Sequence, residues 1–185
     1  MVRVLLVTTG QNAVRNTLSA MEHIDLCVVD MRDYQSETKE SFLKDLWKIL
    51  QRSEAQVLVT WRCPFILPTE IFSVPEYGAY NLHPSLLPAY PGLNPWDEIF
   101  RNGEIVTGVT LHRMTTQADD GEIIYQQEFS ILGAAYEEAR EISDTVAGTM
   151  ISGFMKIIDE IINIISDPNS TNVVPFYEQT PLRMH

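Results

Sequence analysis

Cysteine and basic residues are both scarce in this sequence. Its 185 residues contain two cysteines, Cys27 and Cys63, which are too few for a disulfide framework or a four-ligand zinc site. Lys and Arg together number 13 against 25 Asp and Glu, so the formal net charge is −12. Because broad binding to nucleic acid or to an anionic membrane depends on Lys and Arg, we expect neither as a partner.

Long hydrophobic runs are also absent. The longest apolar run is too short and too interrupted to span a bilayer. The start, Met1-Val2-Arg3, leads straight into a strand-like run without a recognisable signal peptide. We therefore expect a cytoplasmic protein. Without an internal repeat or linker, the chain is expected to form one domain over residues 1–185.

Apolar, β-branched runs alternate with helical spacings through the first sixty residues. Strands are predicted at Val2–Thr8, Ile24–Asp30 and Gln56–Trp61, and helices between them at Asn12–Met21 and Ser36–Gln51. This alternation predicts an α/β fold with a Rossmann-like, open, mostly parallel twisted sheet and helices on both faces.

The later elements follow from the same patterns. They are a strand at Ala79–His83, a short helix at Asn94–Arg101, β-runs at Ile105–Met114 and Glu122–Ser130, a long amphipathic helix at Asp144–Ile165, and a short edge segment at Val173–Phe176. Asn94 is expected to cap the short helix, with Pro95 at its first position. The isoleucine-rich end of the long helix suits either the core or a homodimer interface.

The segment Asn81-Leu82-His83-Pro84-Ser85-Leu86-Leu87-Pro88 combines an amide and an imidazole at a predicted strand end. Asn81 and His83 are two residues apart, so in a strand both side chains project from the same face. Pro84 ends the strand because proline has no N–H for the ladder. Catalytic groups of α/β proteins commonly sit at such strand ends.

These residue types suit attack by an amine on an activated acyl group. The attack places negative charge on the carbonyl oxygen, to which Asn81 and a protonated His83 can each donate a hydrogen bond. Asp119 can favour the charged imidazole or relay protons, although Asp119-Asp120-Gly121 between two strands also fits an ordinary turn. His112, at the end of a β-run, fits a structural role better than catalysis. Direct attack needs no nucleophile, and Ser85 lacks the strained elbow of a hydrolase.

The chain resembles the formyltransferases that use 10-formyltetrahydrofolate. This family includes glycinamide ribonucleotide transformylase, the N-terminal domain of methionyl-tRNA formyltransferase and the sugar N-formyltransferases. The resemblance spans roughly residues 60–130 and lies in Asn81–Pro88, Tyr90-Pro91-Gly92-Leu93, Thr107-Gly108-Val109-Thr110-Leu111-His112, Asp119 and Gly121.

The resemblance implies roles for individual residues. Asn81, His83 and Asp119 match the catalytic Asn, His and Asp of the family. The pterin of 10-formyltetrahydrofolate is expected to bind to two segments, which contain Phe65, Ile66, Leu67, Ala118, Asp120 and Gly121. The acceptor is expected near Pro84 and near the loop after the first strand, which contains Thr9, Gly10, Gln11 and Asn12. No metal is implied.

The implied reaction is transfer of a formyl group to a primary amine of a small molecule, closest to that of phosphoribosylglycinamide formyltransferase in purine biosynthesis. The transformylases that act on glycinamide ribonucleotide bind its phosphate with a glycine-rich loop, whereas Thr8-Thr9-Gly10-Gln11-Asn12 holds one glycine. That loop at a helix N-terminus can still bind an anion. A nucleotide-linked amino sugar as the acceptor, hydrolysis of 10-formyltetrahydrofolate, and an inactive folate-binding homologue remain alternatives.

Overall fold

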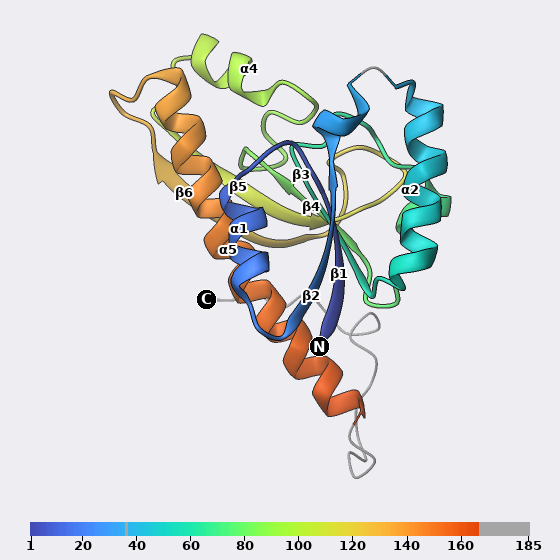
Figure 1. Ribbon diagram of the computed structural model, residues 1–185. Coiled ribbons are helices and arrows are strands. Elements are labelled where there is room, and N and C mark those ends of the chain that lie inside the picture. Colours follow the sequence, from blue (N-terminus) through green and yellow to red (C-terminus); the bar gives the residue numbers. More distant parts are fainter. Residues whose placement is uncertain (36, 167–185) are drawn as a thin grey trace.

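A computed structural model describes residues 1–35 and 37–166 (Figure 1). Its six strands are β1 (Val2–Thr8), β2 (Ile24–Asp30), β3 (Val57–Trp61), β4 (Ala79–His83), β5 (Val106–Arg113) and β6 (Ile123–Ser130). They form one sheet in the order β2-β1-β3-β4-β5-β6. The expected edge segment Val173–Phe176 lies outside the described residues.

The sheet is parallel over its first four strands and antiparallel at the end that β5 and β6 form. β1 pairs in parallel with both β2 and β3, and β3 pairs in parallel with β4. β5 runs antiparallel to β4 and to β6. The predicted α/β fold with an open, mostly parallel sheet is confirmed, and so is the β5–β6 hairpin.

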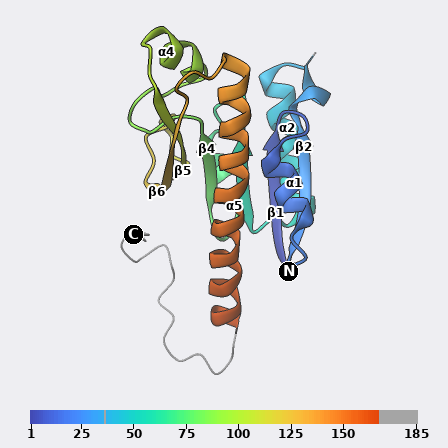
Figure 2. The same cartoon turned by 90° about the vertical axis from the view of Figure 1, so that its left-hand side faces the viewer.

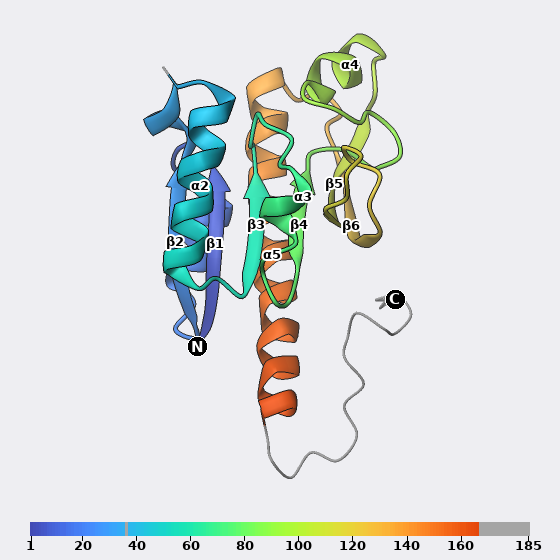
Figure 3. The ribbon, with the colours of Figure 1, turned by 90° about the vertical axis from the view of Figure 1, so that its right-hand side faces the viewer.

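Helices cover both faces of the sheet, as the alternation of buried side chains in β1 requires. Val2, Val4 and Leu6 face one core with α1 (Ala13–Ala20) and α5 (Tyr136–Ser166), which lie side by side in Figure 2. Leu5 and Val7 face the other core with α2 (Lys39–Ser53) and α3 (Thr69–Phe72), which lie over the opposite face in Figure 3. A short 3₁₀ helix, Met31–Tyr34, follows β2.

Helix α4 (Pro95–Arg101) belongs to a third, smaller core. Trp96 and Ile99 of α4 pack with Ile131 and with Ala139 near the start of α5. Asn94 occupies the N-cap position of α4 and Pro95 follows it, as predicted, but the Asn94 side chain makes no capping hydrogen bond. The α4 segment therefore closes over the end of the sheet at which β4 ends (Figure 1).

Helix α5 begins eight residues before the predicted start at Asp144. Its first turns pack on α4 rather than on the sheet. Glu137 and Glu138 favour a helix start at this position because acidic side chains stabilise the first turn. In the described part of the chain, no helix has the length and apolarity needed to cross a membrane.

Candidate active site

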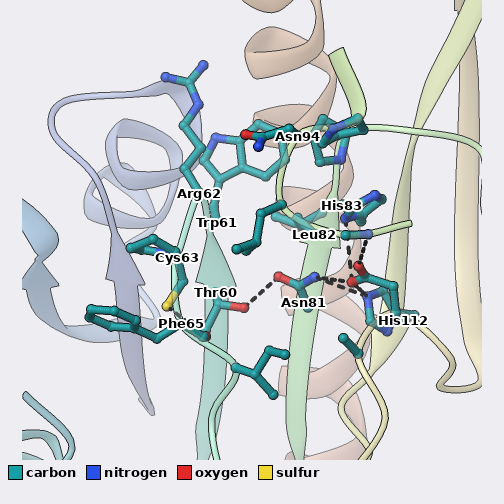
Figure 4. Close-up of a pocket in the computed structure, with 18 of the residues that line it drawn as sticks. Thr60, Trp61, Arg62, Cys63, Phe65, Asn81, Leu82, His83, Asn94 and His112 are labelled. Atoms are coloured by element: carbon teal, nitrogen blue, oxygen red, sulfur yellow. Dashed lines mark hydrogen bonds and ion pairs between the residues drawn. The ribbon is translucent and has the colours of Figure 1, made fainter. Parts of the chain in front are cut away.

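The amide and imidazole of β4 meet two further polar side chains from the β5–β6 hairpin. Asn81 and His83 lie at the end of β4, and the antiparallel register places His112 of β5 opposite Asn81. Asp119 lies in the loop between β5 and β6. Figure 4 shows this cluster at the centre of a pocket, with dashed contacts between Asn81, His83, His112 and their neighbours.

The carboxylate of Asp119 contacts each of the other three side chains. Its Oδ1 lies 3.3 Å from Asn81 Nδ2, 3.5 Å from His83 Nδ1 and 3.4 Å from His112 Nε2. Its Oδ2 accepts a 2.7 Å hydrogen bond from the Gly92 N–H. Burial raises the pKa of Asp119, but His112, the charge of His83 and the Gly92 N–H outweigh burial and hold the pKa below its usual value. Asp119 is therefore an anion at neutral pH and more than a turn residue.

Three contacts determine which way the Asn81 amide points. Its Oδ1 accepts a 2.6 Å hydrogen bond from Thr60 Oγ1, so the Nδ2 group is directed toward His112 and Asp119. His112 Nδ1 faces the Arg113 carbonyl at 2.9 Å, which can only accept, so Nδ1 carries hydrogen. The Asn81 amide nitrogen is thus held as a donor toward His112 Nε2, 3.1 Å away, and toward Asp119.

His83 is oriented by the loop that follows β4. Its Nε2 lies 2.8 Å from the Tyr90 carbonyl, and because a carbonyl only accepts, Nε2 carries hydrogen. Burial lowers the pKa of His83, and although Asp119 and the Tyr90 carbonyl oppose it, the net direction is below the usual value. Burial therefore favours the neutral ring in the free protein, with a lone pair on Nδ1, and a protonated His83 during the reaction stays a prediction.

Backbone strain is concentrated around this cluster. Tyr90 and Asp119 have φ angles of 56° and 54°, a left-handed conformation that side chains other than glycine rarely adopt. Arg62, at the end of β3, has a φ of 59°. Each such residue costs about 1–3 kcal/mol and persists only where the surrounding structure holds it. Here the strained backbone positions the Tyr90 carbonyl and the Asp119 carboxylate against His83.

A pocket of about 570 Å³ contains the cluster. Asn81, His83 and Asp119 line it, together with His112. So do Pro84 from the predicted acceptor region and four of the six predicted pterin residues, Phe65, Ile66, Leu67 and Ala118. The fold therefore brings together most of the predicted site from β3, β4 and the β5–β6 loop.

Two predicted pterin residues do not line the pocket. Asp120 is exposed, and Gly121 packs against the backbone of β5. A Cβ at Gly121 would lie 1.8 Å from the Arg113 carbonyl oxygen, so only glycine fits. Gly121 therefore acts through backbone packing: it lets the chain cross close to β5 and so holds Asp119 in place.

The predicted acceptor loop after β1 contributes only Thr9 to the pocket. Gly10 and Asn12 are buried, and Gln11 is exposed outside the pocket lining. The Asn12 amide donates 2.8 Å to Thr8 Oγ1, and its Oδ1 caps α1 by accepting from the Arg15 N–H. Asn12 is thus occupied by contacts within its own loop.

Two backbone donors of this loop and of the start of α1 are engaged by carboxylates of the chain. Gly10 N–H donates 3.0 Å to Asp30 Oδ1, and Ala13 N–H donates 2.7 Å to Asp144 Oδ2. The Arg32 guanidinium beside Asp30 holds the pKa of that carboxyl well below its usual range. These two N–H groups are therefore not free for an anion, and anion binding by the rest of this helix N-terminus stays a prediction.

The cluster functions without a side-chain nucleophile. Ser85 is buried and donates 2.6 Å to the Ala89 carbonyl, so its hydroxyl is turned away from the pocket lining. Cys63 lines the pocket, but burial raises the pKa of its thiol to about 11. Since only a thiolate is nucleophilic, Cys63 is inert at neutral pH.

His112, for which the sequence favoured a structural role, lies inside the cluster. It is buried, and it contacts both Asn81 and Asp119. The signal that identifies it is the pairing of β4 with β5, which sets His112 opposite Asn81. Strand register depends on partners far apart in the sequence, so the local pattern around His112 did not reveal it.

Comparison with known proteins identifies a family and several relatives. Residues 1–158 match the formyl transferase family. The methionyl-tRNA formyltransferase of Thermotoga neapolitana is 40% identical over 88 residues, which are 48% of this chain and 28% of that protein. The bifunctional polymyxin resistance protein ArnA of Wigglesworthia glossinidia brevipalpis is 33% identical over 116 residues, 63% of this chain and 17% of that protein. The chain thus matches less than a third of the length of these curated relatives.

Solved structures share the fold at lower identity. The phosphoribosylglycinamide formyltransferase of Anaplasma phagocytophilum superposes with a TM-score of 0.73 at 21% identity, over 86% of this chain and 87% of that one. A formyltetrahydrofolate deformylase of Pseudomonas syringae superposes with a TM-score of 0.70 at 20% identity, over 84% and 62%. With the family match covering most of the described residues, this chain belongs to the formyl transferase family.

Proposed function

We propose that the protein transfers the formyl group of 10-formyltetrahydrofolate to a primary amine of a small molecule. The observation that carries this proposal is the convergence of Asn81, His83 and Asp119 on one pocket, with an amide donor, a titratable ring and a carboxylate in mutual contact. Together they supply a hydrogen-bond donor for a developing oxyanion and a path for one proton.

The segment Phe65–Leu67 suits the flat, polar-edged pterin of the formyl donor. Phe65 and Leu67 offer apolar surface, and they lie in the pocket wall after β3. Within the described residues, the backbone N–H groups of Phe65, Ile66 and Leu67 donate no hydrogen bond. Such groups need partners when covered, so Phe65–Leu67 and Ala118 would hold the donor, whose part in the reaction is to supply the formyl group.

Asn81 stabilises the charge that forms when the amine attacks. The Thr60, His112 and Asp119 contacts fix its Nδ2 group as a donor at the pocket wall, where an oxyanion would replace one of the two acceptors. One such donor typically contributes a factor of about 10²–10³ in rate.

His83 moves the proton. Its neutral Nδ1 accepts a proton from the attacking amine, and Asp119 Oδ1, 3.5 Å away, stabilises the resulting imidazolium. The imidazolium then donates the same proton to the leaving nitrogen, which restores the neutral ring. The lowered pKa of His83 thus suits a group that begins the cycle as a base.

Glycinamide ribonucleotide is the proposed acceptor, and a nucleotide-linked amino sugar is the alternative. Phosphoribosylglycinamide formyltransferases of known structure share this fold over most of the chain, which supports the fold of the proposed enzyme and not its acceptor. Both acceptors carry phosphate. After β1, the Gly10 and Ala13 N–H groups are already bound to aspartates, which weakens that loop as a phosphate site.

The test is to follow the release of tetrahydrofolate from 10-formyltetrahydrofolate by the purified protein, with and without each amine. Amine-dependent turnover is expected, and His83→Ala is expected to abolish it without unfolding the chain. His23→Ala, which lies outside the pocket, is the matched control. Amine-independent turnover would assign hydrolysis instead, and no turnover with either amine would favour a folate-binding homologue.

A further inference from the structure

Two arginines line the pocket away from the Phe65–Leu67 segment. Arg62 follows β3 and Arg140 lies in the second turn of α5. Figure 4 shows the Arg62 side chain pointing away from Phe65, with Asn94 close to the Trp61 ring. Their side chains are 33% and 38% exposed, so their guanidinium groups reach solvent and a ligand.

The charge of the pocket wall differs from that of the whole protein. Among the lining residues, the Lys, Arg, Asp and Glu side chains are Arg62, Arg140 and Asp119, whose formal charges sum to +1, whereas the chain carries −12. Asp119 lies with the imidazoles at the catalytic cluster. Asp144 and Glu137 pair with the two arginines, so this end of the pocket offers guanidinium donors without an excess of positive charge.

Each of the two arginines has N–H donors that its ion pair does not use. Arg62 Nη2 lies 3.3 Å from Asp144 Oδ1, but Asp144 also accepts from Trp61 Nε1 at 2.8 Å and from the Ala13 N–H. Arg140 Nη1 pairs at 3.3 Å with Glu137, whose side chain is 75% exposed. A guanidinium carries five N–H donors, so both arginines can bind a further anion.

A buried hydroxyl without a partner lies beside these arginines. Ser143 is 1% exposed and lines the pocket, and its Oγ is one of two buried side-chain polar atoms in the described residues that make no hydrogen bond. It is three residues after Arg140, on the same face of α5. Thr145 and Thr149 of the same helix donate to the carbonyl four residues earlier, at 3.1 and 3.2 Å, which Ser143 does not. An unpaired buried hydroxyl costs free energy, and a ligand oxygen would remove that cost.

We propose that the acceptor carries an anionic oxygen group, phosphate or carboxylate, that binds to Arg62, Arg140 and the Ser143 hydroxyl. This inference rests on the proposed function, because it treats the arginine-lined end of the pocket as the acceptor end. It gives an anion site apart from the loop after β1 and orients the acceptor with its anion on α5 and its amine toward Asn81 and His83.

The experiment measures anion binding directly, without turnover. Inorganic phosphate and, separately, acetate are titrated into the full-length protein at constant ionic strength. Binding is followed by the fluorescence of Trp61 and Trp96, which line the pocket, in a Trp47→Phe background. We expect saturable binding of at least one anion, and the arm that binds tells phosphate from carboxylate recognition.

Matched variants locate the bound anion. Arg62→Gln and Arg140→Gln are each expected to raise the Kd by about tenfold, the scale of a charge-assisted hydrogen bond, and Ser143→Ala by a smaller factor. Arg101→Gln removes the same charge from an exposed position outside the pocket and is expected to leave the Kd unchanged. Because Arg140 is on the surface, its variant tests the proposal even where Arg62→Gln perturbs folding.

The outcomes separate this inference from the proposed function. Absence of saturable binding by both anions, or binding that survives both arginine substitutions, overturns the anion site while leaving formyl transfer standing. Anion binding that depends on the arginines, in a protein that turns over no amine, supports the anion site and counts against formyl transfer.

Discussion

Two loops at the same edge of the sheet use their polar groups in opposite ways. In the loop after β1, Gly10, Asn12 and the Ala13 N–H are all bound to side chains or backbone of the chain itself. At the end of β4, Asn81 and His83 face a pocket of about 570 Å³. Asn81 contacts His112 and Asp119, and His83 contacts Asp119. Both loops follow parallel strands, where α/β proteins bind ligands, so position alone does not assign function. The comparison teaches that the pocket decides: Asn81 and His83 line it, whereas the loop after β1 contributes only Thr9.

The largest expected effect is on catalysis at the β4 end. Asn81→Ala removes the oriented donor and is expected to lower kcat of formyl transfer by about 10²–10³-fold, with little change in stability. Steady-state kinetics with saturating amine measures this loss. Asn16→Ala, an exposed asparagine of α1, is the control. A kcat within about threefold of the parent chain would remove Asn81 from the oxyanion role.

The next effect is on folding at the β1 side. Asp144→Ala leaves Ala13 N–H, Trp61 Nε1 and Arg62 without their shared acceptor, and is expected to reduce the free energy of unfolding by about 3 kcal/mol. Urea denaturation measures it. Glu141→Ala, an exposed acidic residue of the same helix, is expected to stay within about 0.5 kcal/mol of the parent chain. Equal losses in the two variants would show that Asp144 does not join α1 to α5.

A smaller effect is expected from Asn12. Asn12→Ala removes the N-cap of α1 and should lower stability by about 1 kcal/mol, whereas Asn12→Asp keeps a capping oxygen and should recover most of it. Thermal denaturation separates the two variants. The KM for the acceptor amine should stay unchanged in Asn12→Ala, and a large rise in that KM would restore the loop to the acceptor site.

The smallest effect is a pH dependence of stability. The pKa of His83 is lowered from 6.5 by burial, so the unfolded chain takes up a proton that the folded chain resists, and stability falls as pH drops below 6.5. The pKa of Asp119 is also lowered, so the stability that this carboxylate contributes is lost only below pH 3.8. A change in stability between pH 6.5 and about pH 5 therefore reports the histidine. Unfolding experiments across this window should show a shallower slope in His83→Gln. An unchanged slope would mean that burial does not penalise the charged ring.

Much of the fold could be predicted because its signals are local. Runs such as Val2–Thr8 and Ile24–Asp30 carry their own pattern of buried, β-branched residues, and the structure confirms both strands. The start of α5 was missed because its first turns pack on α4, a contact between segments far apart in the sequence. Propensity and periodicity describe neighbours along the chain, whereas this boundary depends on a tertiary contact.

The site, like the fold, could be predicted from the sequence only where its signals are local. The spacing of Asn81 and His83 and the Asp119 turn were sufficient for the sequence to predict an acyl-transfer cluster. His112 came from strand register, and the neutral state of His83 came from burial. The pairing of Gly10 with Asp30 and of Ala13 with Asp144, which occupies the predicted anion loop, joins residues 20 and 131 positions apart.

Sequence by itself determined which chemical groups this protein has and the local elements that carry them. Tertiary structure decided which of those groups bind one another and which can bind a ligand. Hydrogen-bond partners, burial and charge state all depend on distances across the fold. Asn12 and Asn81 illustrate this: both are asparagines at the C-terminal edge of the sheet, and only the fold shows that one caps a helix and the other faces the pocket.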